Sequence, residues 1–391
     1  MVQARVQRND ARILGAVTKL AANQGWAEVT FSGVGREAGL SVRPVRDRYP
    51  TRALLGADTW VEVAGPALAE TLNRALSASG LLDGPVDEVA FAAAMDELTV
   101  PNDSLKAAVE LIVVSCFEPD IRGAINASLA ITLGDWLDPI AAGTPARAAK
   151  RGYLLILALG LIATRRPGVP DLDMHPQWNR LLAAFATDLA PTPLPDEPRP
   201  AFLTHIPFDT GDPITDNVLR AAIDLLGRYG YEGTLLPSVA ADANITEASI
   251  YLRYPSKEAF IIDAINRQQD IALPGQRAYL ARLEERYGVG VAEAIAIRDT
   301  MHPREYLINV IDMEHLRLTW HRPNLAAEEE ARLQNLVREV LANDPTNQDF
   351  ADPARLHISR ALGVGIGLLP LIDGQAWQLP YDVATTPLTQ I

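Results

Sequence analysis

The sequence predicts an all-α protein that contains two copies of one helical unit. Apolar residues recur at helical spacing along most of the chain, and no segment alternates convincingly in the manner of a strand. One residue pattern also occurs twice at a constant offset, so that residue 25 corresponds to 230 and residue 49 to 254. This offset is far longer than the roughly 20–50 residues of a solenoid repeat. We therefore expect a tandem duplication of a whole domain.

Each copy opens with a predicted amphipathic helix that ends at a glycine. In the first copy, apolar residues stand at helical spacing across 13–21 and stop before Gly25. In the second copy they run across 218–226 and stop before Gly230. The two helices therefore begin equivalent units.

The next predicted element is a short helix that leads into a sharp turn. Thr30 would cap this helix in the first copy, whereas Pro237 would lie in its first turn in the second copy. Gly39 and Asn244 then occupy matching positions, and these residue types adopt positive φ most readily. Two short helices joined by such a turn are typical of a helix-turn-helix motif.

A third short helix and a longer fourth helix follow in each copy. Ser41 and Thr246 are placed to cap the third helix with their hydroxyl groups. The pairs Pro50-Thr51 and Pro255-Ser256 would end that helix and cap the longer one. The first three helices of each copy form a three-helix helix-turn-helix unit, and we call the segments that contain these units the first head and the second head.

A proline-rich segment separates the copies. Prolines at 191, 193, 195, 198, 200, 207 and 213 resist helix and sheet, and they predict a semi-rigid spacer that extends about 3.1 Å per residue. The remaining sequence is helical by periodicity, and its most apolar stretches are 153–163 and 362–369. We therefore expect a first head at 1–60, a first body at 61–190, a linker at 191–213, a second head at 214–266 and a second body at 267–391.

Both heads also contain short sequence motifs at matching positions. The second copy has the turn Ala243-Asn244-Ile245-Thr246 and the exit Tyr254-Pro255-Ser256-Lys257; the first has Ala38-Gly39-Leu40-Ser41 and Tyr49-Pro50-Thr51-Arg52. On these residues the chain resembles the TetR family of bacterial transcriptional regulators. The first copy departs from the family at Arg46, where the family usually has the tyrosine seen at Tyr251.

The resemblance implies a head that reads double-stranded DNA with the N-terminal residues of its third helix. Arg43 could bind guanine through two hydrogen bonds, whereas Glu247 could accept from cytosine but repels phosphate. The alternative for each basic residue is a solvated surface side chain, and Tyr49 is also a candidate core aromatic. The residues expected at the DNA are Thr30, Ser41, Val42, Arg43, Pro44, Arg46, Arg48, Tyr49 and Arg52 in the first head, and Thr246, Glu247, Ala248, Ser249, Tyr251, Arg253 and Lys257 in the second.

The resemblance also implies pairing through the last two helices of each body. Here one chain supplies both sides, 146–190 and 354–391, so we expect a monomeric pseudo-dimer. Pro370, Pro380 and Pro387 should interrupt the second set of helices. Because the two reading helices differ, the operator should be non-palindromic, with half-sites about 34–36 Å apart or a multiple of that distance.

Charge is distributed unevenly between the heads. The whole chain has a formal net charge of −14. Residues 1–61 hold nine basic and five acidic side chains, whereas residues 210–270 hold five basic and nine acidic ones. Because phosphate contacts provide most of the affinity for DNA, we expect the first head to bind DNA more strongly.

The bodies could hold a small-molecule effector. The candidate lining residues are Tyr306, Asp312, His315 and Trp320 in the second body, and Ser115 and Trp136 in the first. Polar groups among apolar ones are typical of a ligand pocket, and the second body has more of them. The alternative, that neither body holds a ligand, remains open.

Several other classes of protein are disfavoured. No catalytic constellation, nucleotide-binding loop or metal-ligand spacing is present, and the single Cys116 excludes an internal disulfide, so we expect no enzyme activity and no cofactor. The apolar run at 153–164 is too short to span a bilayer and no signal peptide opens the chain, which indicates a cytoplasmic protein. The function expected is a ligand-responsive regulator, a repressor, and the main alternative is a sequestering or scaffold protein that has lost DNA binding.

Overall fold

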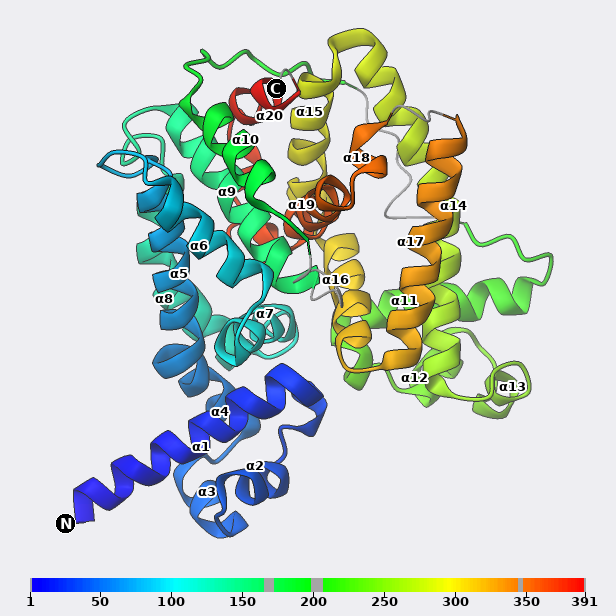
Figure 1. Ribbon diagram of the computed structural model, residues 1–391. Helices are drawn as coiled ribbons and strands as arrows, with labels where there is room; N and C mark the ends of the chain where they lie inside the picture. The colour runs from blue at the N-terminus through cyan, green and yellow to red at the C-terminus, as the bar shows by residue number, and fades with distance from the viewer. Residues whose placement is uncertain (1, 165–171, 198–206, 344–346, 390–391) are drawn as a thin grey trace.

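The computed structural model describes residues 2–164, 172–197, 207–343 and 347–389 of the chain, and these contain no strand. The prediction of an all-α fold is therefore confirmed. Figure 1 shows the first half of the chain on the left and the second half on the right, with the two heads at the lower side of the molecule.

The first half begins with a three-helix segment and continues into a helical body. Its short elements are the 3₁₀ turn η1 (Trp26–Glu28) and the π-helical turn η2 (Trp60–Ala64). Its α-helices are α1 (Val2–Gln24), α2 (Phe31–Ala38), α3 (Val42–Arg48), α4 (Arg52–Thr59), α5 (Gly65–Ala78), α6 (Glu88–Thr99), α7 (Asp103–Val114), α8 (Pro119–Leu137), α9 (Pro145–Thr164) and α10 (His175–Ala186).

The second half follows the same order with different helix lengths. Its short elements are the 3₁₀ turns η4 (Pro303–Glu305) and η5 (Ala376–Gln378). Its α-helices are α11 (Pro213–Gly233), α12 (Leu236–Asp242), α13 (Glu247–Tyr251), α14 (Lys257–Tyr287), α15 (Val289–Met301), α16 (Tyr306–Trp320), α17 (Pro323–Asn343), α18 (Gln348–Ala351), α19 (Pro353–Ile372) and α20 (Asp382–Leu388).

The turns of both heads have the expected backbone geometry. Gly39 has φ 62°, and Asn244 has φ 55°, the one positive φ among the described residues other than glycine. The Thr30 hydroxyl accepts from the N–H of Gly33 at 3.0 Å, and the Thr246 hydroxyl accepts from the N–H of Ser249 at 3.3 Å. The predicted turn and both threonine caps are therefore confirmed.

One predicted cap is wrong. Ser41 occupies the N-cap position of α3, but its side chain makes no capping hydrogen bond. The caps of the longer helices form as expected, because the hydroxyls of Thr51 and Ser256 accept from the N–H groups of Leu54 and Ala259 at 3.1 Å.

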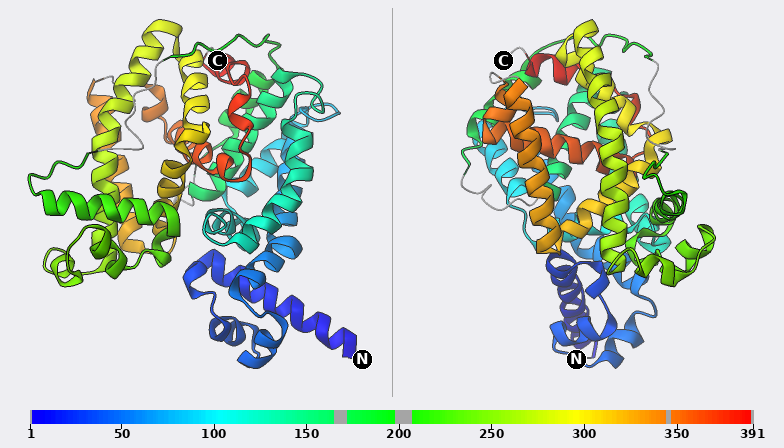
Figure 2. Two further views of the ribbon diagram at one scale, coloured as in Figure 1. Left: turned by 180° about the vertical axis from the view of Figure 1, so that it is seen from behind. Right: turned by 90° about the vertical axis from the view of Figure 1, so that its right-hand side faces the viewer.

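The two halves meet along α9 and α19, which cross at the centre of the molecule (Figures 1 and 2). A Cβ built on Gly160 would overlap the carbonyl oxygen of Ala361, and one built on Gly365 would overlap that of Ile156. Glycine at both crossing points lets the helix backbones approach this closely. The contact is reciprocal, because each helix contributes one glycine and one carbonyl.

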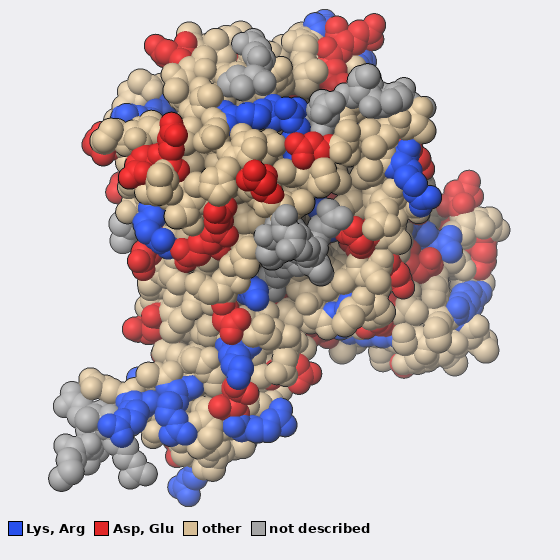
Figure 3. All heavy atoms as spheres, viewed as in Figure 1, with Lys and Arg blue, Asp and Glu red and all other residues tan. Residues whose placement is uncertain are grey.

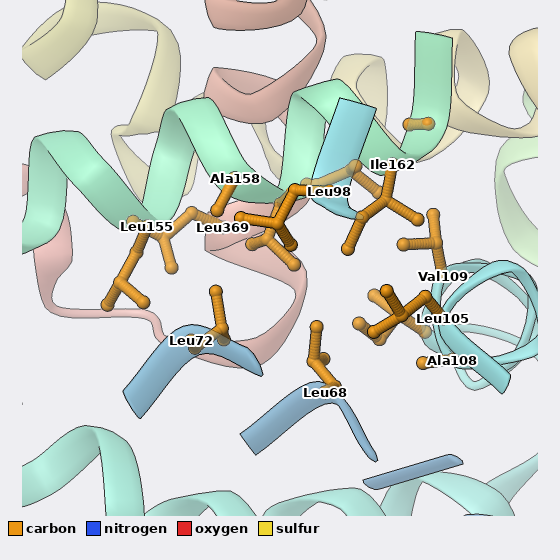
Figure 4. Close-up of a cluster of buried hydrophobic side chains, with 14 of the residues drawn as sticks. Leu68, Leu72, Leu98, Leu105, Ala108, Val109, Leu155, Ala158, Ile162 and Leu369 are labelled. Atoms are coloured by element: carbon orange, nitrogen blue, oxygen red, sulfur yellow. The ribbon is translucent and has the colours of Figure 1, made fainter. Parts of the chain in front are cut away.

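Side chains of both halves share one apolar core. Figure 4 shows leucines of α5, α6, α7 and α9 in contact in the first body, with Leu369 of α19 among them. By length and composition α19 could cross a membrane, but it is the core helix that packs on α9, and half of its apolar window is buried. This makes it weak evidence for a membrane span.

The C-terminal helices differ from the expectation. Pro370 lies inside α19, which continues to Ile372, so the helix is not interrupted there. Pro370 has no N–H, so one hydrogen bond to the preceding turn is missing although the helix continues. The following helix α20 is shorter than α10, with 7 residues against 12.

The linker is not a detached spacer over the part that the structure describes. The N–H of Thr192 donates to Asp382 at 2.8 Å, and the Arg298 guanidinium donates to the carbonyl of Pro195 at 2.9 Å. Glu197 forms an ion pair with Arg286 at 2.7 Å. Residues 191–197 form neither helix nor strand, as the prolines predict, and these contacts fix them to the second body. Residues 198–206 lie outside the described residues.

Candidate nucleic-acid interface

The third helix of the first head, α3, presents cations on its exposed face. Val45 is buried and anchors the helix, whereas the Arg43 side chain is 89% exposed. It forms a loose ion pair with Asp47, at 3.6 Å. Arg43 therefore has most of its hydrogen-bonding capacity available at the surface.

Two further arginines extend this basic face. Arg46 lies over the ring of Phe31, with 5.3 Å between the guanidinium carbon and the ring centroid. Arg48 pairs with Asp10 at 3.1 Å and is still half exposed. Lys and Arg side chains gather on the first head in Figure 3, which agrees with its positive charge. A basic face on the third helix of a helix-turn-helix head can contact DNA phosphates and base edges.

The corresponding helix of the second head, α13, has the same fold and different chemistry. Ile250 is buried where the first head has Val45. At the position of Arg43 the second head has Ala248, preceded by the acidic Glu247. Tyr251 is 53% exposed. The second head therefore presents hydroxyl, aromatic and acidic groups where the first presents guanidinium groups.

Two cations of the second head, Arg253 and Lys257, form contacts with other groups of the protein. Arg253 pairs with Asp212 at 3.5 Å and donates to the carbonyl of Ser249 at 2.9 Å. Lys257 donates to the carbonyl of Tyr231 at 2.6 Å and lies 4.5 Å from the centre of its ring. Burial lowers the pKa of Lys257. Its ammonium group is thus turned toward the head's own aromatic residue.

Arg52 takes the same inward role in the first head. It lies over the Trp26 ring, 5.0 Å from the centroid, and pairs with Glu118 at 3.2 Å. Tyr49 is 3% exposed and belongs to the core of the head. The structure therefore does not place Arg52, Lys257 and Tyr49 at the expected DNA surface. Their side chains instead stabilise the packing of their own heads.

Each head is attached to its body through a buried glutamate. The N–H of Trp26, which follows Gly25 at φ 88°, donates to Glu110 at 2.8 Å. The N–H of Tyr231, which follows Gly230 at φ 67°, donates to Glu314 at 2.7 Å. Both glutamates are buried, and each lies at the matching place of its half, on α7 or α16.

One arginine joins these two attachments. Arg317 of α16 is 3% exposed and contacts Glu314 at 2.6 Å and Glu110 at 3.0 Å. It also pairs with Glu232 of the second head at 2.7 Å. His321 completes the cluster with a contact of 3.0 Å between its Nε2 and Glu110. We call these five residues the junction cluster.

The charge of Arg317 controls the ionisation of the cluster. Burial alone would raise the pKa of Glu110, but the charge of Arg317, the contact with His321 and the Trp26 N–H outweigh burial and lower this pKa to about 2. Burial opposes ionisation of Glu232 in the same way, and Arg317 again lowers the pKa. The carboxylates in turn raise the pKa of Arg317 well above its usual range. Glu110, Glu232 and Arg317 are therefore ionised at neutral pH.

Sequence reasoning missed this junction cluster. The position of Arg317 in α16 is held by the buried Val113 in α7, so the duplicated pattern gives no indication of the arginine. The available signal was Glu110 and Glu314, which are charged residues at matching places in largely apolar helices.

The expected pocket residues do not converge on one cavity. Asp312 lines a cavity of about 290 Å³ between α14, α16 and α17, and Trp320 lines a different cavity of about 680 Å³. Tyr306 contacts Arg122 and Cys116 of the first half. Three others pack in the interior and line neither cavity: Ser115, Trp136 and His315.

A comparison with known protein families finds a match in the second head. Residues 218–264, from α11 into α14, match the family model described as bacterial regulatory proteins, tetR family. No curated protein matches the chain. The match identifies a helix-turn-helix head of the TetR type at 218–264 and suggests that the protein binds DNA. The match supports a transcriptional regulator of the TetR family, a class that is generally not enzymatic.

Proposed function

We propose that the protein is a transcriptional regulator in which two fused TetR-like units form an internal pseudo-dimer. The observation that carries this proposal is a set of reciprocal contacts between the halves. A Cβ on Gly25 would meet His321 at 2.7 Å, and one on Gly230 would meet Phe117 at 2.8 Å. Phe117 and His321 stand at matching places, because Phe117-Glu118-Pro119 and His321-Arg322-Pro323 correspond in the two bodies at an offset of 204 residues. Each half therefore covers the other's head glycine. Contacts of this kind are typical of a two-fold interface.

The crossing of α9 and α19 supports the same arrangement. Gly160 and Gly365, and likewise Ile156 and Ala361, keep the offset that relates Gly25 to Gly230. Duplication accounts for this register, because one ancestral interface would supply both contacts. The proposed units are 1–60 with 61–190 and 214–266 with 267–391, and the fused chain acts as a monomer in the cytoplasm.

The proposed DNA contact is asymmetric. Val42, Arg43, Pro44, Arg46 and Arg48 of the first head would supply most of the affinity. The exposed side chains of α13 would read a different half-site with less help from charge. The operator is then non-palindromic, and repression follows from occupying it.

Ligand response would act through α16. The cavity beside Asp312 lies against α16, the helix that carries Arg317 and the attachment of the second head. An occupant that favours one position of α16 would change how the heads are held, in proportion to its difference in affinity for the two states.

A scaffold or sequestering protein is the second candidate. It is favoured by the acidic second head and by the inward contacts of two of its cations, Arg253 and Lys257. In that case the first head alone, or neither head, binds DNA.

Electrophoretic retardation of DNA from upstream of the protein's own gene tests the regulator directly. At about 50 mM salt, where phosphate contacts are strongest, we expect a retarded complex that weakens steeply as salt rises. No retardation would favour the scaffold. A solution mass of 42.4 kDa is expected for the pseudo-dimer. An obligate dimer of the chain would point to pairing between chains.

A further inference from the structure

The cavity between α14, α16 and α17 is lined mainly by hydrogen-bond acceptors where it is polar. Its volume of about 290 Å³ is at the small end for ligand sites, which are typically about 300–1,000 Å³. Asp312 projects from α16, Glu329 from α17 and Gln268 from α14. The lining thus combines two carboxyl groups and one amide oxygen from three different helices.

These acceptors are incompletely satisfied by the described part of the chain. The side chain of Gln268 is buried, with 5% of the residue exposed, and its Oε1 has no hydrogen-bond partner among the described residues. Asp312 accepts one long hydrogen bond of 3.3 Å, from the amide of Gln269. A buried acceptor without a donor is costly, which indicates that a donor from outside the chain fits here.

The one arginine of the lining is directed elsewhere. Arg332 pairs with Asp270 at 2.7 Å and also donates to Asn266. The charge of Arg332 is therefore paired with Asp270 and not with the carboxyl groups of the cavity. Burial raises the pKa of Asp312 to about 6, and the hydrogen bond from Gln269 opposes this only in part. A positive charge placed beside Asp312 would favour its ionised form.

The lining also includes the amides of Gln269 and Gln276, and its other side chains are apolar. Leu273 lies on α14, Ile308 on α16, and Leu333 and Leu336 on α17. These side chains can cover a hydrocarbon body while the acceptors bind a charged head group.

We propose that this cavity binds a small organic cation, an ammonium ion with an apolar body, whose N–H groups are held by Asp312, Glu329 and Gln268. The proposal rests on the proposed function only in calling this ligand an effector, because binding can be measured without DNA. The counterpart of Asp312 in the first half is Ala108, a buried core residue, so the site belongs to the second body alone.

Titration calorimetry on the full chain, without DNA, tests the site. The probes are alkyl and aryl ammonium ions of graded size, each with its neutral amide and its carboxylate counterpart. We expect at least one ammonium ion to bind while its amide and carboxylate counterparts do not. Asp312→Asn and Glu329→Gln should each weaken that binding at least tenfold. Glu328→Gln, on the exposed neighbouring position, should leave it unchanged, and thermal unfolding without ligand checks that each variant folds.

Two results would overturn the cation site: no binding by any ammonium ion, or equal binding by the matched amides. Unchanged affinity in both cavity variants would overturn it as well. If the cation binds but retardation of DNA is the same with and without it, the site stands and the effector role fails. Loss of DNA binding by the unliganded protein would instead count against the regulator, whatever the cavity binds.

Discussion

The two heads have the same backbone and present different surfaces. Gly39 and Asn244 make the same turn, and Val45 and Ile250 fill the same buried position. On the exposed face, however, the first head has Arg43 where the second has Ala248. The second head is the one that matches the TetR family model, although it is the poorer in basic residues.

This contrast separates two properties that a family match combines. The turn, the caps and the buried side chains are the positions that fold the head. Affinity for DNA depends on exposed positions that the fold leaves open. A head can therefore keep the family's fold while its reading surface changes, and the more divergent head can be the better DNA binder.

The largest expected effect concerns the link between the heads. Replacing Arg317 with alanine should destabilise the protein by about 3–5 kcal/mol, because it leaves buried carboxylates without their cation. Urea unfolding at neutral pH measures the loss. The control is Arg277→Ala, which removes a surface ion pair with Glu339 and should cost about 1 kcal/mol or less. Similar losses from the two variants would mean that the junction cluster does not connect the heads.

Acid should weaken the same link. The pKa of Glu110 is lowered from 4.5 to about 2, so its contribution is present above pH 4.5 and is lost as pH falls toward 2. The shift corresponds to a loss on the order of 3 kcal/mol in the free energy of unfolding. Urea unfolding across this range measures it. Glu110→Gln removes the titrating group, so that variant should lose less stability over the same range; parallel curves for the two proteins would contradict the assignment.

The helix crossing offers a symmetric pair of substitutions. Gly160→Ala and Gly365→Ala should each destabilise the protein by about 1–3 kcal/mol, since each Cβ would overlap a carbonyl oxygen of the other helix. Gly363→Ala lies on the same helix with nothing within 4 Å of its Cβ, and it should be neutral or stabilising by up to about 1 kcal/mol. Chemical unfolding gives all three values. A large loss at only one of the two crossing glycines would break the proposed reciprocity.

The smallest effect distinguishes the caps within the heads. Thr30→Ala and Thr246→Ala should each cost about 1 kcal/mol, because each hydroxyl caps a helix. Ser41→Ala should cost almost nothing, because Ser41 makes no capping hydrogen bond. Thermal unfolding compares the three, and a loss at Ser41 equal to that at Thr30 would show that the caps are not distinguished in this way.

Local features of the heads could be predicted from the sequence because they depend on neighbouring residues. The turn at Gly39, the cap at Thr30 and the apolar helix after Pro145 all follow from propensity and spacing. The junction cluster could not be predicted, because Glu110 and Arg317 are distant in sequence and meet only when the halves pack. Of the residues that line the cavity, the sequence predicted only Asp312. Gln268 could not be predicted, because the packing of the halves determines which face of α14 borders the cavity.

The central claim is that the first head supplies most of the affinity for DNA. Fluorescence anisotropy with upstream DNA, repeated over a range of salt, measures each head's share. Arg43→Ala should weaken binding by about 1–3 kcal/mol and change the sequence preference at one half-site. Arg253→Ala is the comparison in the second head, because the position of Arg43 is Ala248 there and Arg253 stands at the position of Arg48. Lys257 is less suitable, because its ammonium group contacts Tyr231 within the head. Arg253→Ala should change affinity much less than Arg43→Ala. Equal losses from the two variants, or a larger loss from Arg253→Ala, would contradict the account.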